Sequence, residues 1–181
     1  MVNEPLALIA SFIAMAFVVI AYFVKKKGLY LLFQLLCIIF LVVSYFFEAK
    51  FFAMIGLIVG LGRTTTFFIY EQKGKQAPIF WPFLFSGLTI AVYWIVNFGI
   101  QQNSSPYDIL NLFALVMYAF IFRIRDLKIV RFTMLAPTVL EIAFNICVQS
   151  TIFAILVYVF ELGANLVSIV KYHIIPKIKG E

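Results

Sequence analysis

Seven apolar runs divide the 181-residue chain, and most of them are close to the roughly 20 residues that a helix needs to cross a bilayer. They span residues 6–24, 29–47, 52–70, 81–100, 109–123, 129–149 and 152–171. Because 65% of the residues are hydrophobic and only 12% are charged, a soluble domain of this length could not hide its apolar side chains from water. The sequence therefore predicts an all-α, polytopic membrane protein with seven transmembrane helices, forming one domain over residues 1–181.

The cations are distributed unevenly between the two sides of these helices. If the amino end lies outside, thirteen of the fourteen cations face the cytoplasm and only Lys50 faces out. The thirteen are Lys25, Lys26, Lys27, Arg63, Lys73, Lys75, Arg123, Arg125, Lys128, Arg131, Lys171, Lys177 and Lys179. Cytoplasmic loops of membrane proteins are rich in Lys and Arg, so we expect an outside amino end and a cytoplasmic carboxyl end. The net charge of +6 then needs no nucleic acid as a partner.

An internal repeat is suggested when the chain is shifted against itself by 101 residues. This offset brings the first three helices onto the last three without a gap, and it aligns Leu61-Gly62 with Leu162-Gly163 and Thr64 with Asn165. Identities are few, and chance similarity between apolar helices is the alternative explanation. We expect a parallel 3+1+3 arrangement. Its parts are a first three-helix repeat at 6–70, a linker helix at 81–100 and a second three-helix repeat at 109–171.

Such parallel triplets resemble the layout of SWEET sugar carriers and PnuC-type vitamin transporters, although the chain has no Pro-Gln dipeptide and only Pro137 can serve as a hinge proline. Two short motifs carry a closer resemblance. The third helix ends in Gly60-Leu61-Gly62-Arg63-Thr64, and the last contains Gly163-Ala164-Asn165. In these motifs the chain resembles the YgjV-type family of small bacterial inner-membrane proteins. The resemblance implies a multi-pass protein of the bacterial inner (plasma) membrane and implies little about its chemistry.

Three ionisable residues, Arg63, Glu141 and Glu161, fall at bilayer depth, away from the ends of the apolar runs. At about 1.5 Å per residue they lie roughly 16, 18 and 14 Å from a helix end, which places all three near the bilayer midplane. Ionisable groups at this depth are costly and usually face the bundle interior or a water-filled cavity. A structural alternative is that Arg63 pairs with one glutamate or extends toward the cytoplasm. Two acids facing one base leave a surplus charge, which favours a functional role for the glutamates.

Polar residues also recur at intervals of three and four, a spacing that keeps them on one helical face. The faces are Gln34, Cys37, Ser44 and Glu48; Ser86, Thr89, Tyr93 and Asn97; Thr138, Glu141, Asn145 and Gln149; and Tyr158, Glu161, Asn165, Ser168 and Tyr172. Because these groups would otherwise lie unsatisfied in hydrocarbon, we expect a shared polar cavity. Single Asn and Ser contacts, worth roughly 0.6 kcal/mol each, are equally ordinary helix packing. The GxxxG pattern at Gly56–Gly60 predicts close packing of helices within the protomer.

Together these features predict a small transporter that moves a polar or weakly cationic molecule, such as a vitamin, nucleoside, amine or sugar, through a midplane site between the repeats. Glu141 and Glu161 would bind the solute or a coupling proton, and Arg63 would hold the empty site together. The predicted site comprises Arg63, Thr64, Tyr93, Asn97, Glu141, Asn145, Glu161 and Asn165, with Pro137 as a hinge.

The alternative function is a non-transporting structural or accessory subunit of a membrane complex, with a dry centre in which Arg63 bridges both glutamates. An enzyme is not expected, because the chain has no HExxH, no Gly-x-Ser-x-Gly and no Cys/His pair at one depth. No cofactor or metal is predicted. The expected partners are a small-molecule substrate and the lipid bilayer. The substrate, the direction of flux, proton coupling and assembly into a homo-oligomer stay open.

Overall fold

The computed structural model describes residues 4–47, 51–96, 106–147 and 152–175, and within these ranges the chain forms seven α-helices and no strand. The helices are α1 (Glu4–Phe23), α2 (Lys27–Phe47), α3 (Phe51–Gln72), α4 (Phe80–Trp94), α5 (Asp108–Ile121), α6 (Leu127–Cys147) and α7 (Ile152–Ile169), and α7 continues into the π-helical turn η2 (Val170–Ile174). The all-α prediction is confirmed. Four helical segments are long and apolar enough to span a membrane: Pro5–Phe23, Lys27–Phe47, Leu127–Cys147 and Ile155–Ile174.

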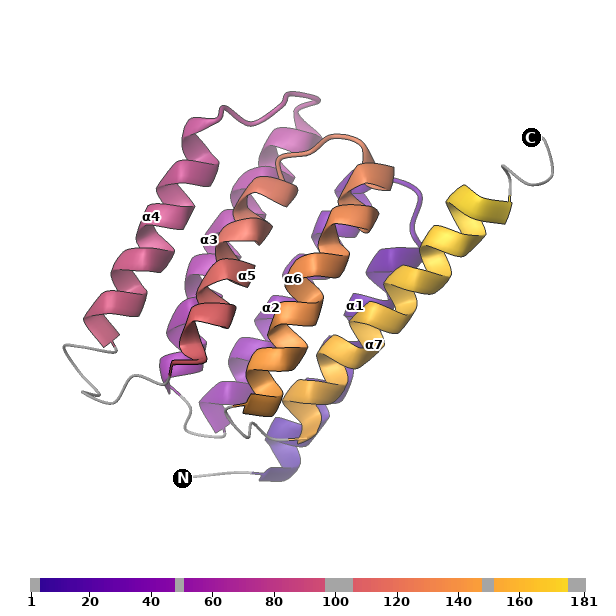
Figure 1. Ribbon diagram of the computed structural model, residues 1–181. Helices are drawn as coiled ribbons and strands as arrows, with labels where there is room; N and C mark the ends of the chain where they lie inside the picture. Colours follow the sequence, from indigo (N-terminus) through magenta and orange to yellow (C-terminus); the bar gives the residue numbers. More distant parts are fainter. Residues whose placement is uncertain (1–3, 48–50, 97–105, 148–151, 176–181) are drawn as a thin grey trace.

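The helices pack in the order in which they follow one another in the chain. Each contacts the next, and α1 also packs against α7, so the order of contacts closes on itself. Figure 1 shows α4 to α7 in front and α1 to α3 behind them. Helix α4 lies between the two triplets because it contacts both α3 and α5. This layout is compatible with the expected 3+1+3 arrangement, while the repeat and the membrane orientation remain predictions.

The interior of the bundle is more polar than its outer surface. Along α6, the buried side chains include Arg131, Thr138, Glu141 and Asn145, whereas large aliphatic and aromatic side chains such as Phe46 are exposed on the outside. In lipid the outer face is already in an apolar solvent, so polar groups gather where they can find one another. The polar faces predicted from the sequence therefore point inward wherever the structure describes them.

Cations gather at one end of the bundle. The connections at 24–26, 73–79 and 122–126 all lie at the end opposite the amino terminus (Figure 1) and carry Lys25, Lys26, Lys73, Lys75, Arg123 and Arg125. This is the end that we predict to face the cytoplasm, and the text below calls it the cationic end.

Candidate functional site

Two adjoining cavities lie inside the bundle. The first measures about 90 Å³ and the second about 60 Å³. Glu141 and Tyr158 line both, together with Gly56, Leu57 and Leu115. Polar residues specific to the first cavity are Tyr45, Thr89, Tyr93, Asn111 and Asn145. Those specific to the second are Gln34, Arg63, Tyr118 and Glu161. The structure thus brings the three intramembrane charges to one cavity.

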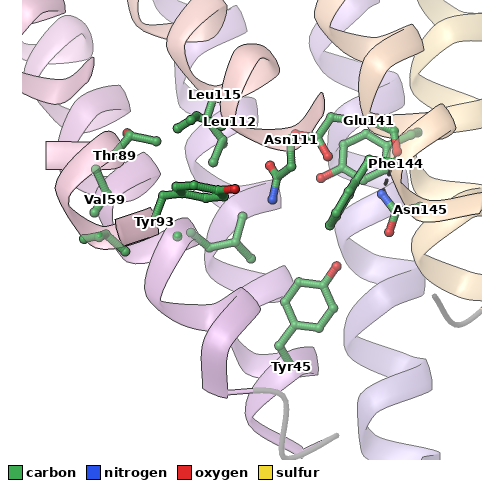
Figure 2. A pocket seen from close by; sticks show the side chains of 14 residues that line it. Tyr45, Val59, Thr89, Tyr93, Asn111, Leu112, Leu115, Glu141, Phe144 and Asn145 are labelled. Carbon is green, nitrogen blue, oxygen red and sulfur yellow. Dashed lines mark hydrogen bonds between the residues drawn. The ribbon is translucent and has the colours of Figure 1, made fainter. Parts of the chain in front are cut away.

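The first cavity is built by residues near the helix ends that are farthest from the cationic end. Tyr45 lies near the end of α2, Tyr93 near the end of α4, and Asn111 near the start of α5. In Figure 2 the hydroxyl groups of Tyr93 and Tyr45 point into the shared space, and Asn111 lies between Tyr93 and Glu141. The first cavity therefore lies on the side of the bundle that we predict to face outward.

Glu141 occupies the junction of the two cavities. Only 3% of the residue is exposed, and within the described part of the chain its carboxylate has no hydrogen bond and no ion pair; the one ion pair there joins Lys27 to Glu71 at 3.3 Å. The Asn145 side chain forms no hydrogen bond with this carboxylate, because Asn145 Nδ2 donates instead to the backbone oxygen of Glu141 at 2.8 Å. The carboxylate of Glu141 is consequently available to a ligand in either cavity.

Glu161 is held in place by a tyrosine. Its carboxylate accepts a hydrogen bond of 2.7 Å from the Tyr22 hydroxyl, and only 4% of Glu161 is exposed. Gln34 lines the same cavity and has its amide nitrogen 3.5 Å from the hydroxyl of Tyr30. Glu161 is therefore a fixed acid on the wall of the second cavity, in contrast to Glu141.

Arg63 forms no ion pair with a glutamate among the described residues. Its Nη1 donates to the Leu115 backbone oxygen at 2.8 Å, and its guanidinium lies 5.4 Å and 5.3 Å from the ring centroids of Tyr118 and Phe122. Among the described residues its Nε has no hydrogen-bond partner. Cation–aromatic contacts of this kind stabilise a desolvated cation without neutralising a nearby acid. The second cavity thus holds two acids and one cation that form no ion pair with one another or with any other described residue.

Four aromatic residues in mutual ring contact lie beside the second cavity, and two of them, Tyr118 and Phe122, line it. Tyr22 and Tyr30 are 5.5 Å apart between ring centroids, Tyr30 and Phe122 are 6.3 Å apart, and Phe122 and Tyr118 are 6.1 Å apart. All four are buried. Tyr22, Tyr30 and Phe122 come from helix ends next to the connections at 24–26 and 122–126. We call these four residues the aromatic plug.

The remaining predicted site residues lie in different settings. Tyr93 and Asn145 line the first cavity. Thr64 and Asn165 are fully buried but line neither cavity; Asn165 Nδ2 donates to the Arg131 backbone oxygen at 2.8 Å. Their environment is that of helix packing. Asn97 lies outside the described residues, as do Glu48 and Gln149. Pro137 lies inside α6, one turn before Glu141, and its hinge role stays a prediction.

The prediction that the GxxxG pattern at Gly56–Gly60 brings helices into close contact is wrong. A Cβ added at Gly56 would meet no atom within 4 Å, and one at Gly60 would meet only the guanidinium of Arg63 at 3.7 Å. Gly56 lines both cavities and Gly60 lines the second. These glycines therefore leave room for the cavities and do not bring two helices into close contact.

Sequence reasoning also missed the buried position of Arg131, since the charge pattern identifies it only as one of the cytoplasmic cations. It is 2% exposed, and its Nη2 donates to the backbone oxygens of Tyr22 at 3.2 Å and Val24 at 2.7 Å. The Tyr172 hydroxyl donates to the Phe23 backbone oxygen at 2.8 Å. Together they satisfy carbonyl groups that the end of α1 leaves unpaired. The helical periodicity of the sequence could have indicated this position, because Arg131 lies on the same face of α6 as Thr138 and Glu141.

Asn111 and Tyr45 were missed as well, since neither belongs to a polar face of its own helix. Asn111 lies alone in an apolar run, and Tyr45 is adjacent to Ser44 but off its face. Only the order in which helices pack shows that both reach the first cavity. No group of three or more potential metal ligands occurs among the described residues.

The helices and their buried polar interior define an integral membrane protein with a cavity between its helices. More particularly, the chain belongs to the Imp-YgjV family of bacterial inner membrane proteins, which it matches over residues 6–174. No curated protein and no solved structure matches the chain. The protein is thus a multi-pass protein of the bacterial inner membrane, and its likeness to SWEET and PnuC-type transporters stays one of expected layout.

Proposed function

We propose that the protein is a small carrier that moves a polar or weakly cationic small molecule through the two cavities. The observation that supports this most directly is the carboxylate of Glu141, which is buried at their junction without a partner among the described residues. A buried charge normally requires a partner, and an acid at bilayer depth that lacks one suits a ligand or a proton that comes and goes.

The chemistry of the first cavity suits a small amine or a hydroxyl-bearing solute. An ammonium group would donate to Glu141, and the rings of Phe144 and Tyr158 line the same space, where aromatic faces attract cations. Asn111 supplies an amide group that can donate and accept. A cavity needs about 10–15 Å³ of such volume to hold one water, so about 90 Å³ accommodates several waters or a small organic group.

The arrangement supports an outward-facing resting state. The first cavity lies toward the amino-terminal end of the bundle, while the aromatic plug lies beside the second cavity, toward the cationic end. Transport would require the plug to open toward the cytoplasm after the solute reaches Glu141. Pro137 is suited to flex α6 between the cationic end and Glu141, because a proline removes a backbone hydrogen bond from the helix.

The accessory-subunit alternative predicted that Arg63 bridges both glutamates. In the described part of the chain Arg63 contacts a backbone oxygen and two rings instead. This arrangement favours the carrier, since an acid that served packing alone would be expected to bond to its neighbours.

The first experiment is a thermal-shift screen of the purified protein against amines, polar vitamins, nucleosides and sugars. We expect a hit that stabilises the protein but not its Glu141→Gln variant. Asp126→Asn is the matched control, because Asp126 lies in an exposed connection. Its Oδ1 accepts a hydrogen bond from the Lys128 backbone N–H at 2.8 Å, and asparagine retains that oxygen. Uptake of the hit into proteoliposomes that is unchanged in the Glu141→Gln, Glu161→Gln double variant would refute the site.

A second pair of variants tests the cavity itself. Gly56→Leu places a side chain into both cavities, whereas Gly87→Leu adds the same group to an exposed position of α4; an added Cβ meets no atom within 4 Å at either glycine. We expect Gly56→Leu to abolish uptake of the hit and Gly87→Leu to retain it. Equal uptake by both variants would show that solute does not pass through the cavities.

A further inference from the structure

An apolar groove of about 410 Å³ runs along the lipid-facing seam between α1 and α7. Its lining is entirely apolar: Val19, Phe23, Val159, Phe160, Gly163 and Ala164. Gly163 keeps the groove open, because it is exposed and a Cβ placed there would meet no atom within 4 Å. The groove is distinct from the two interior cavities and shares no lining residue with them.

The groove reaches a cation at its cytoplasmic end. The Lys171 ammonium lies 5.7 Å from the ring centroid of Phe23, a groove residue, and 5.4 Å from that of Tyr172. Lys171 is exposed, and no ion pair engages it within the residues that the structure describes. An apolar channel that ends at an available ammonium group matches the order of groups in a phospholipid, from acyl chain to phosphate.

A second body of positive charge adjoins Lys171. Tyr172 lines an open depression of about 1030 Å³ at the cationic end. Its ring, which Lys171 contacts, also lies 4.8 Å from the guanidinium of Arg131, measured to the ring centroid. The charged residues of the depression are Lys25, Lys26, Lys27, Glu71, Arg125, Asp126, Lys128 and Arg131. Glu71 is already paired with Lys27, so cations outnumber acids around any headgroup placed here.

From this continuity we propose that an anionic phospholipid of the cytoplasmic leaflet binds at this seam. One acyl chain lies in the groove, and the phosphate lies against Lys171, beside the basic depression. Both parts contribute to the affinity: a free phosphate would use only the cations, and a neutral lipid would use only the groove and bind more weakly. The proposal is independent of the carrier function, because none of its residues lines either interior cavity.

The test uses the full-length protein, stripped of lipid in detergent and titrated with phosphatidylglycerol or with phosphatidylcholine of the same acyl chains. Binding is followed by native mass spectrometry and by the shift in melting temperature. We expect the unmodified protein to bind phosphatidylglycerol more tightly. Because one lysine near an anionic headgroup contributes about 1 kcal/mol, Lys171→Gln should weaken phosphatidylglycerol binding about fivefold and leave phosphatidylcholine binding unchanged.

Gly163→Leu fills the groove and should abolish the binding of both lipids at this site. Its control is Gly87→Leu, and the control for Lys171→Gln is Lys75→Gln, which removes an exposed cation from a distant connection. Lys171→Gln replaces an exposed side chain whose contacts are with the Phe23 and Tyr172 rings, so it keeps the test decisive if Gly163→Leu lowers the yield of folded protein. Equal affinity for the two lipids overturns the proposal. So does glycerol 3-phosphate that stabilises the protein as well as phosphatidylglycerol does, because that result identifies a phosphate site without a role for the groove.

Discussion

The hydrogen bond between Tyr22 and Glu161 allows a quantitative test of the site. Tyr22→Phe removes the hydroxyl that donates to the Glu161 carboxylate at 2.7 Å and retains the ring, whose centroid lies 5.5 Å from that of Tyr30. Both residues are buried, so water does not easily replace the lost donor. The variant therefore isolates a single polar interaction inside the bundle.

The expected magnitude depends on the charge of Glu161. A hydrogen bond to an ionised group contributes about 1.5–3 kcal/mol, whereas side-chain hydrogen bonds measured inside a membrane protein average about 0.6 kcal/mol. A double-mutant cycle of Tyr22→Phe with Glu161→Met measures the coupling free energy. We expect about 1.5–3 kcal/mol if the carboxylate is ionised. In the Glu161→Gln background, which keeps an acceptor oxygen but no charge, Tyr22→Phe should cost only about 0.6 kcal/mol. The cycle with Glu161→Gln should therefore return the difference, about 0.9–2.4 kcal/mol.

The measurement is the free energy of unfolding, obtained by titrating SDS into mixed micelles for the unmodified protein, the two single variants and the double variant. Independent sites add within about 0.3–0.5 kcal/mol. A coupling free energy inside that range would show that Tyr22 does not hold Glu161, and the described connection between the cavity and the aromatic plug would be refuted.

Three further predictions concern orientation, the hinge and the end of α1. Cys147 is exposed at the end of α6 that we predict to face outward, and Cys37 is buried. A membrane-impermeant maleimide added to intact spheroplasts should therefore label the protein but not its Cys147→Ser variant. Labelling only after lysis would show that the orientation is the reverse of the predicted one. Pro137→Ala should raise the free energy of unfolding by up to about 3 kcal/mol while slowing uptake of an identified solute, and unchanged uptake would contradict the hinge. Arg131→Met should lower the free energy of unfolding by about 1.5–3 kcal/mol, with partial recovery in Arg131→Lys, and a loss below about 0.5 kcal/mol would show that the α1 carbonyl groups find other partners.

The helices were largely predictable because charged connections interrupt the apolar runs. The run at 29–47 corresponds to α2 at Lys27–Phe47, and the run at 129–149 corresponds to α6 at Leu127–Cys147. Helix α4 ends at Trp94 and passes into a short π-helical turn at 95–96, and residues 97–100 of the predicted helix at 81–100 lie outside the described residues. Composition sets where a helix can lie in a bilayer, and it leaves the position of its last regular turn to local backbone geometry.

The site was predictable only in part, for a different reason. Spacing at three and four residues places Glu141 and Asn145 on one inward face, which the structure bears out. Spacing within one helix carries no information about which neighbour that face meets. Asn111 and Tyr45 enter the first cavity because α5 and α2 pack beside α6 and α3, respectively. Arg131 was misplaced because the positive-inside rule counts a cation at a helix end as solvent-facing, although its side chain turns back over the end of α1.

The two glutamates are equivalent by composition and depth, and their different partners separate their roles. Glu161 accepts from Tyr22, and Tyr22 belongs to the aromatic plug, so in the proposed carrier a change in the charge of the second cavity would act on the plug. Glu141 has no such bond among the described residues and faces both cavities. In the proposed carrier, a cationic solute at Glu141 would offset the negative charge beside Glu161, favour its ionised form and so strengthen its hydrogen bond to Tyr22. Solute binding would then hold the aromatic plug closed and solute release from Glu141 would loosen it, through electrostatics across the second cavity.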